Sequence, residues 1–315
     1  MPTFYDSSQY AKLNIHMIGP ILALLCGFSF ALNNIFLRRG VYHSRESFSP
    51  VVISIFLGTL FFGAWLVVSD QILSIFSVSW LGFTSLAGAG ILHLLIGRAF
   101  AYTGIRLVGA NRSVPIQTCF IIIAAVVGVL LFGEPMGISL AVALLLVAGG
   151  IALLGTVGRY ERDTLGISSG KLAKGIFAAL AAAICFGLSP ILIKIGLQEV
   201  NSPIVATFIS SLAAAFVISI LLLSQRNREK LRKLDRSSLY PFIISSMAIS
   251  ASQILRYLAL DYSPVSIVVP LTGTNSLFVF PLSFLMNRHI EAFNFRVAAG
   301  ALAVVTGVFL LFWFA

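Results

Sequence analysis

The chain has 315 residues, of which 58% are hydrophobic and only 10% are charged, and its mean hydropathy is +1.00. A soluble domain is about 45–50% apolar and about 25% charged, so this composition excludes a water-soluble protein and indicates an integral membrane protein. The net charge of +10 comes from Lys and Arg between apolar segments, where membrane proteins place them, and this pattern argues against nucleic-acid binding.

Ten apolar segments reach or approach the roughly 20 residues that a helix needs to cross a bilayer core. They lack the alternation of apolar and polar residues that marks the strands of a membrane β-barrel, so we expect α-helices. The predicted spans are 17–38, 50–69, 80–103, 109–132, 136–156, 174–197, 203–224, 240–262, 265–286 and 295–315. The sequence therefore predicts an all-α integral membrane protein with ten transmembrane helices.

The second half of the chain repeats the first half. Gly19–Gly40 aligns with Gly175–Gly196 without a gap, and seven of the 22 positions are identical. Further matches follow in the same order, and they pair Arg98 with Arg256, Pro115 with Pro270, and residues 150–154 with residues 307–311.

Each repeat holds five of the predicted helices. Because five is an odd number, the two copies must enter the membrane from opposite sides, which makes them inverted repeats of the kind that transporters use. We expect a first five-helix repeat at 17–156, a linker at 157–173 and a second five-helix repeat at 174–315.

The distribution of Lys and Arg indicates how the spans are oriented. Seventeen of the 21 basic residues fall on one side of the predicted spans, whereas Lys12 and Lys194 fall on the other side and Arg98 and Arg256 lie within helices. The positive-inside rule assigns the basic side to the cytoplasm. We therefore expect a multi-pass protein of the cell (inner) membrane with both termini outside the cytoplasm.

Three sequence features, in their order within the duplicated unit, resemble a known family. The first is a helix end that starts with tyrosine, Tyr102–Gly109, followed by a helix that contains Pro115. The second is the Gly-Glu-Pro turn at Gly133–Pro135. The third is the counterpart of the first feature in the second repeat, Tyr257–Leu260 followed by Pro264 and Pro270. Over nearly its whole length the chain is similar to the EamA branch of the drug/metabolite transporter superfamily. The second repeat departs from the pattern, because Arg288-His289 stands where the first has Gly133-Glu134.

The resemblance implies a secondary transporter of small metabolites and not an enzyme, and it favours export over import. It also implies that helices 1, 3, 4, 6, 8 and 9 line a central cavity, with helices 5 and 10 at the periphery. A lipid-handling protein such as a polyprenyl-phosphate flippase is the alternative, because it would also need paired arginines. A transporter better explains the inverted duplication, the matched prolines and the central polar groups together.

Polar side chains at membrane depth are costly, and they usually face the bundle interior or a water-filled path. In the first repeat the candidates for a substrate cavity are Asn33, His93, Arg98, Tyr102 and Gln117. Arg98 and Tyr102 lie one turn apart and share a helix face. The alternative for these residues is structural, namely hydrogen bonds between helices or, for Arg98 and Tyr102, anchoring at the lipid headgroups.

The second repeat offers a matching set of candidates. Ser189 is the repeat counterpart of Asn33. One stripe of the eighth predicted helix carries Gln253, Arg256 and Tyr257, and one face of the ninth carries Thr272, Asn275 and Ser276. Pro115 and Pro270 each remove a backbone donor. Distorted helices at matching places in two repeats point to a transporter's binding site, although the neighbouring hydroxyls could equally serve only the distorted backbone.

Arg98, Arg256 and His93 are the charged or titratable groups that reach inward, whereas all eleven acidic residues lie in loops or at helix ends. Cations in a low-dielectric site favour an anionic partner, so we expect a small metabolite with a carboxylate or a phosphate, such as an amino acid. His93 is the central group that titrates near neutrality. The sequence indicates no cofactor and no metal site, and it leaves the oligomeric state open, with a homodimer as one arrangement.

Overall fold

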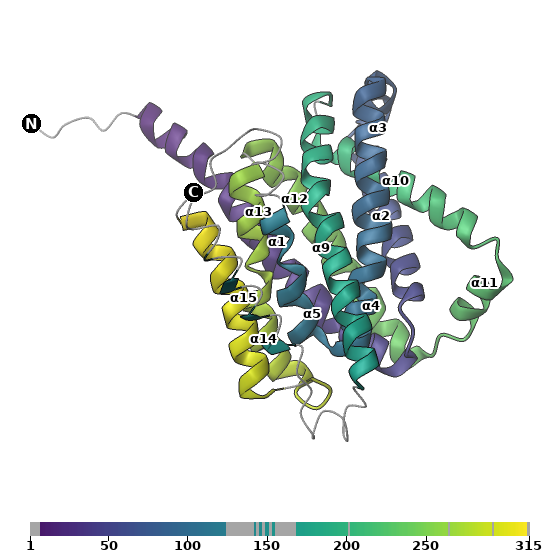
Figure 1. The fold of residues 1–315 in the computed structure, drawn as a ribbon. Helices are drawn as coiled ribbons and strands as arrows, with labels where there is room; N and C mark the ends of the chain where they lie inside the picture. Colours follow the sequence, from purple (N-terminus) through teal and green to yellow (C-terminus); the bar gives the residue numbers. More distant parts are fainter. Residues whose placement is uncertain are drawn as a thin grey trace, which may run out of the picture.

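The computed structural model describes residues 7–123, 168–200, 202–263, 265–291 and 293–313, together with a few positions between 142 and 154. The described residues form helices that are joined by short turns (Figure 1). Most of the predicted span 136–156 and all of the Gly133–Pro135 turn lie outside the described residues.

The helices fall into two series, one before residue 124 and one after residue 167. The first series is α1 (Ser7–Ser44), α2 (Phe48–Val68), the 3-10 helix η1 (Ile72–Ser77), α3 (Trp80–Ala89), the π-helix η2 (Gly90–Gly97), α4 (Arg98–Val108) and α5 (Ala110–Gln117). The second series is α9 (Ser169–Gln198), α10 (Pro203–Leu221), α11 (Gln225–Arg232), α12 (Arg236–Tyr262), α13 (Val265–Gly273), α14 (Asn275–Asn287) and α15 (Phe295–Trp313).

Seven stretches of the described chain are long and apolar enough to cross a membrane. They are the counterparts of predicted spans one to three and six to nine, namely Ile18–Ser44, Phe48–Val68, Trp80–Val108, Ser169–Gln198, Pro203–Leu221, Arg236–Tyr262 and Ile267–Asn287. A shorter apolar stretch, Phe295–Gly307, falls in the tenth predicted span. The all-α membrane fold is thus confirmed.

Several helices differ in extent from their predicted spans. α1 continues past residue 38 to Ser44, and the third predicted helix continues to Val108, where Gly109 ends it with a φ of 87°. Only glycine adopts such a conformation without strain. α9 begins at Ser169, inside the predicted linker, because the side chain of Ser168 accepts a hydrogen bond from the Lys171 N–H at 3.3 Å and caps the helix.

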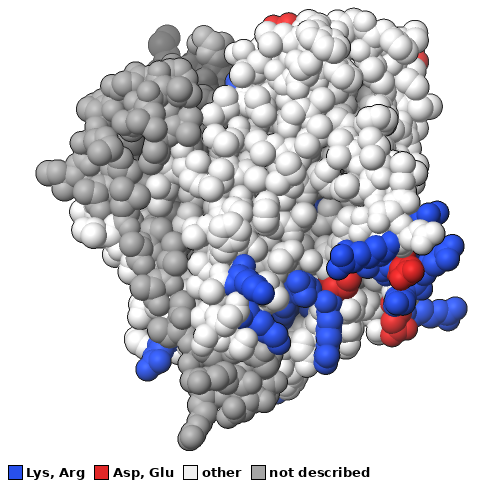
Figure 2. Space-filling view, turned by 45° about the vertical axis from the view of Figure 1, so that its right-hand side comes forward, with Lys and Arg blue, Asp and Glu red and all other residues white. Residues whose placement is uncertain are grey.

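The first helices of the two series run in opposite directions. In Figure 1, α1 descends to the end of the molecule at which α9 begins, and α9 then rises to the other end. Figure 2 shows that Lys and Arg gather toward the lower end of the molecule. In Figure 1, α1 finishes and α11 lies toward this end. The two series therefore enter the bundle from opposite sides, as expected of inverted repeats.

Each first helix packs mainly against the other series. α1 lies along α12 and the α13–α14 pair, while α9 lies along the continuous α3–η2–α4 helix and along α5. The two halves are therefore interlocked, because the third and fourth helices of each repeat hold the first helix of the other.

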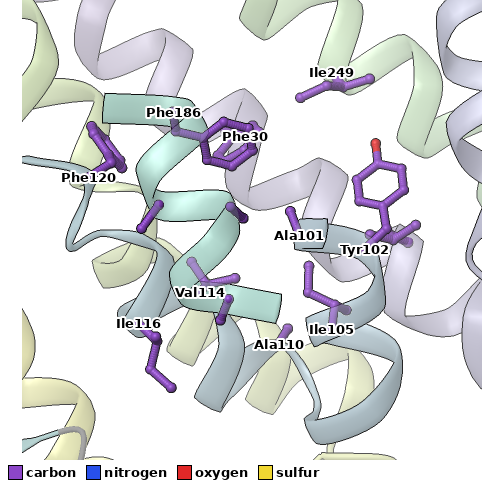
Figure 3. Packing of buried hydrophobic residues seen from close by; sticks show 14 of the residues in the cluster. Phe30, Ala101, Tyr102, Ile105, Ala110, Val114, Ile116, Phe120, Phe186 and Ile249 are labelled. Atoms are coloured by element: carbon purple, nitrogen blue, oxygen red, sulfur yellow. The ribbon is translucent and has the colours of Figure 1, made fainter. Parts of the chain in front are cut away.

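Two pairs of repeat-equivalent residues lie side by side. The rings of Phe30 and Phe186 meet edge to face with their centroids 6.1 Å apart (Figure 3). The Pro115–Pro270 match makes Thr118 the equivalent of Gly273, and a Cβ on Gly273 would lie 3.3 Å from the Thr118 methyl group. A residue meets its own symmetry counterpart only near a symmetry axis, so a pseudo-two-fold axis passes between these pairs.

The two helices that carry the repeat-matched prolines, Pro115 and Pro270, are interrupted close to that axis. α5 ends at Gln117, two residues after Pro115, and helix resumes at Phe120. α13 ends at Gly273, three residues after Pro270, and α14 begins after Thr274. A proline ring removes a backbone donor and disturbs the preceding turn. Each matched proline thus lies two or three residues before a helix break, and the two breaks face each other.

The helix of the third predicted span contains a π-helical segment, η2, directly before Arg98. Gly90 at its start touches the backbone of α10, and a Cβ there would lie 2.0 Å from the carbonyl oxygen of Ser210. π-Helical turns are rare and occur mostly at functional sites. This close approach requires glycine.

We expect Gly90→Ala to destabilise the protein by about 1–3 kcal/mol, the usual cost of overpacking a tight interface. Thermal unfolding of the purified protein in detergent measures this as a lower midpoint temperature. Gly170→Ala is the matched control, because nothing lies within 4 Å of a Cβ at that helical glycine. Equal midpoints for the two variants would contradict the close packing of η2 on α10.

Candidate functional site

The polar candidates lie inside the bundle. Each of the twelve exposes at most 6% of its surface, and Arg256 is the most exposed of them. A side chain that anchors the protein at the lipid headgroups has to reach the surface. The burial of Arg98 and Tyr102 therefore argues against the anchoring alternative.

Asn33 and Ser189, which occupy equivalent positions in α1 and α9, each contact the third helix of the other repeat. Oδ1 of Asn33 accepts a hydrogen bond from Ser245 at 2.7 Å, and it also accepts one from the Tyr102 hydroxyl at 3.1 Å. Ser189 Oγ lies 2.6 Å from Nδ1 of His93. The first helix of each repeat is therefore joined to the third helix of the other repeat by polar side chains as well as by packing.

A small cavity lies beside Arg98, and both repeats contribute to it. Its polar lining residues come from α2, α4, α10 and α12, and they are Ser54, Arg98, Ser211, Ser250 and Gln253. The guanidinium of Arg98 donates to Ser54 Oγ at 3.0 Å. The structure therefore brings together Arg98 and Gln253, two candidates that are 155 residues apart in the chain.

The interior around this cavity is electropositive. The charges of Arg98 and Arg256 repel each other, and both act on the ring of His93. His93 also packs on Phe186, with ring centroids 4.6 Å apart. Among the described residues Glu291 is the one buried carboxylate, and it pairs with Arg38. The cations near the cavity thus attract anions.

The two tyrosines are fixed by hydrogen bonds to other helices. Tyr257 donates to Ser210 Oγ at 2.7 Å, and Ser210 in turn donates to the Leu86 carbonyl at 2.8 Å. Tyr102 is held by Asn33, as described above. Each of these hydrogen-bond chains therefore joins three helices. Tyr257 helps to position its neighbour Arg256, and Tyr102 helps to position Arg98 one turn earlier.

The candidates near the two helix breaks are held in different ways. The hydroxyls of Thr272 and Ser276 donate to backbone carbonyls three residues earlier, at 2.8 and 3.0 Å. Gln117 donates to Ser113 Oγ at 2.8 Å. Oε1 of Gln117, Oδ1 of Asn275 and Nε2 of Gln253 are buried and have no hydrogen-bond partner among the described residues. Each of these three amides therefore keeps one buried polar atom without a partner, whereas the hydroxyls of Thr272 and Ser276 bond to their own backbone.

Sequence reasoning did not single out the serines around the cavity, Ser54, Ser211 and Ser250, or Ser245 beside Asn33. Serine is common in membrane helices, and its hydroxyl can bond to its own backbone. The one available signal was the location of Ser250 one turn before Gln253 on the predicted stripe. The contribution of α2 and α10 became visible only from the packing.

Comparisons with known proteins agree with this architecture. The EamA-like transporter family matches residues 17–156 and 173–313. A crystal structure of a protein with 16% sequence identity superposes on 91% of this chain and on 94% of its own chain, with a TM-score of 0.60, which shows a shared fold. The curated proteins contain no match. The molecule is a multi-pass membrane transporter with two repeats and not an enzyme, and it belongs to the EamA-like transporter family.

Proposed function

We propose that this transporter moves a small anionic or zwitterionic metabolite, such as an amino acid, by alternating access. The observation that carries the proposal is Arg98, a buried guanidinium whose described hydrogen-bond partner is the neutral Ser54. A buried charge is costly unless a counter-charge compensates it. A substrate carboxylate or phosphate would supply that counter-charge.

The residues around Arg98 suggest how such a substrate is held. Arg98 and Arg256 would attract its anionic group, and the amides of Gln253 and Asn275 would bind its polar groups. A site built from a few convergent polar groups in an apolar interior is typical of small-molecule binding. Both repeats contribute to this set, as expected for a site at the repeat interface.

The size of the cavity supports transport with conformational change. Its volume of about 10 Å³ is room for about one water molecule, which is much less than a metabolite needs. Binding therefore requires the helices to separate. The facing breaks of α5 and of α13–α14 supply places at which helices can bend, and such breaks allow one repeat to move against the other.

We further propose that the basic end of the molecule faces the cytoplasm and that transport runs outward. The Lys and Arg side chains in Figure 2 gather at the end on which α11 lies, and the positive-inside rule assigns such an end to the cytoplasm. The start of α1 and the end of α15 lie toward the opposite end (Figure 1). Both termini would then be outside the cytoplasm.

Arg256→Gln should weaken substrate binding about ten- to hundredfold, because a hydrogen bond to a charged group contributes about 1.5–3 kcal/mol. Counterflow of radiolabelled amino acids in proteoliposomes should show a higher KM with a smaller change in the maximal rate. Arg288→Gln, which removes a charge from an exposed side chain, is the control and should behave like the wild type.

Two outcomes would contradict the anionic substrate. One is transport of lipophilic cations that survives Arg256→Gln. The other is a thermal shift of the purified protein with lipid-linked phosphates but not with amino acids or their derivatives, since a ligand of the native state raises its stability. The second outcome would favour the polyprenyl-phosphate flippase.

In the closed state His93 is buried beside two arginines, so a proton can reach its ring only when the transport path opens. If transport is coupled to protons through this imidazole, His93→Gln should flatten the pH dependence of transport between about pH 5 and 8. Glutamine keeps a polar group within reach of Ser189 and does not titrate. Initial rates in proteoliposomes across this range measure the effect. An unchanged pH profile would show that His93 serves only as a hydrogen-bond partner of Ser189.

Orientation can be tested with single cysteines in the basic segment Arg226–Arg236, in a background without Cys26, Cys119 and Cys185. These three native thiols are not in disulfide bonds. Replacing them ensures that the introduced cysteine is the one thiol that can react. In intact cells an impermeant thiol reagent should leave the introduced cysteines unmodified. Rapid modification would place the basic end outside the cell and both termini in the cytoplasm.

A further inference from the structure

Arg38 and Glu291 form a buried ion pair at the basic end of the bundle. Nε of Arg38 lies 3.0 Å from Oε1 of Glu291, and the two side chains expose 7% and 1% of their surface. Arg38 belongs to α1, and Glu291 to the segment between α14 and α15. The pair therefore joins the first repeat to the second.

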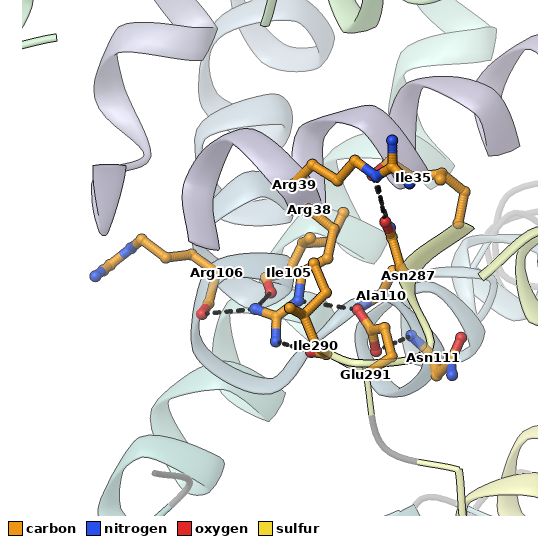
Figure 4. A network of polar contacts seen from close by, with 10 residues as sticks. All are labelled: Ile35, Arg38, Arg39, Ile105, Arg106, Ala110, Asn111, Asn287, Ile290 and Glu291. Carbon is orange, nitrogen blue, oxygen red and sulfur yellow. Dashed lines mark hydrogen bonds and ion pairs between the residues drawn. The ribbon is translucent and has the colours of Figure 1, made fainter. Parts of the chain in front are cut away.

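Further hydrogen bonds connect this pair to two more helices (Figure 4). The Arg38 guanidinium donates to the carbonyls of Ile105 and Arg106 at the end of α4, at 3.1 and 3.3 Å. The carboxylate of Glu291 accepts from the backbone N–H groups of Ala110 and Asn111, at 2.6 and 3.2 Å. An acidic group at a helix N-terminus satisfies free donors and complements the helix dipole. Glu291 therefore holds the start of α5, the helix that carries Pro115.

The opposite end of the bundle has a counterpart of Arg38. In the ungapped alignment of the first helices, Arg38 corresponds to Lys194, which donates to the Leu260 carbonyl near the end of α12 at 2.7 Å. Each repeat thus joins a basic residue of its first helix to the end of its third helix. Among the described residues the ion pair with a carboxylate is found only at the basic end.

A buried ion pair contributes little net stability, because the loss of hydration offsets most of the attraction between the charges. The same balance lets the pair separate at low cost when water enters, since both groups are then hydrated again. An ion pair between moving parts is therefore suited to a contact that breaks and re-forms. One that only held the fold together would gain little over apolar packing.

We propose that Arg38 and Glu291 form the gate that closes the basic end of the transport path, and that their ion pair separates when the path opens to that side. Separation removes the link between Arg38, which holds the end of α4, and Glu291, which holds the N-terminus of α5. It thereby frees the helices that carry Gln117 and Arg98. The proposal rests on alternating access, and it does not depend on the charge of the substrate.

The test measures access to Ser283→Cys from the basic face in a background without the three native cysteines. Ser283 is fully buried and lies one turn before Asn287 on α14, and Asn287 donates to the Ile35 carbonyl in the same network at 2.9 Å. An impermeant charged thiol reagent should modify this cysteine slowly in the otherwise unchanged protein. Glu291→Gln keeps the shape of the side chain and removes its charge, so it should speed modification about tenfold or more, because Arg38 is left buried without a counter-charge.

A double-mutant cycle separates the ion pair from other effects. Arg38→Gln alone should also speed modification. Arg38→Gln with Glu291→Gln should give less than the combined effect of the two single changes, since neither member of the pair is then left charged without the other. Arg288→Gln removes an exposed charge from the same segment and should leave the rate within about twofold of the reference.

A second cysteine, at Ser263 near the opposite end, distinguishes a gate from general loosening. When the basic end opens, access to Ser263→Cys from the opposite face should fall or stay the same. Equal increases at both positions in Glu291→Gln would show that the pair only stabilises the fold, and an unchanged rate at Ser283→Cys would overturn the gate outright. Because the measurement needs no substrate, a failure here is distinguishable from a failure of the anionic-substrate proposal.

Discussion

The exchange of first helices between the two repeats is the contact on which the rest of the structure depends. α1 lies along α12 and α9 along α3–η2–α4, and Phe30 meets Phe186 where the two cross the pseudo-axis. Neither repeat could bury its first helix in this way by itself. The same exchange brings Asn33 to Ser245 and Ser189 to His93, so packing and polar contacts have one geometric origin.

The absence of water from the bilayer core explains which polar groups bond where. Each unpaired polar group there is costly, and serine and threonine hydroxyls solve this locally by donating to carbonyls of their own helix, as Thr272 and Ser276 do. Asparagine and glutamine amides carry more donors and acceptors than one helix can satisfy. The free atoms of Gln253 and Asn275 are therefore better indicators of a ligand site than the more numerous hydroxyls.

The amino-acid sequence was sufficient to predict the class of fold, because apolar length and the duplicated pattern both depend on local features. It also marked Arg98, Arg256 and Gln253, since charged and amide groups are rare at membrane depth. It could not show that Ser54 and Ser211 face Arg98, because that depends on how α2 and α10 pack. Arg38 and Glu291 were read as part of the basic side and as a loop carboxylate, respectively, since burial of a helix end or a loop is set by neighbours distant in the chain.

The π-helical segment η2 has a consequence for the energetics of the whole cycle. A duplicated protein with perfect inverted symmetry would have two end states of equal free energy, related by a half-turn about the two-fold axis, and would divide its time evenly between them. The corresponding helix of the second repeat, α12, is a regular α-helix over its full length. The wider turn in one repeat alone makes the two repeats inequivalent, so under the alternating access proposed above the two end states would differ in free energy before any substrate or ion gradient acts on the protein.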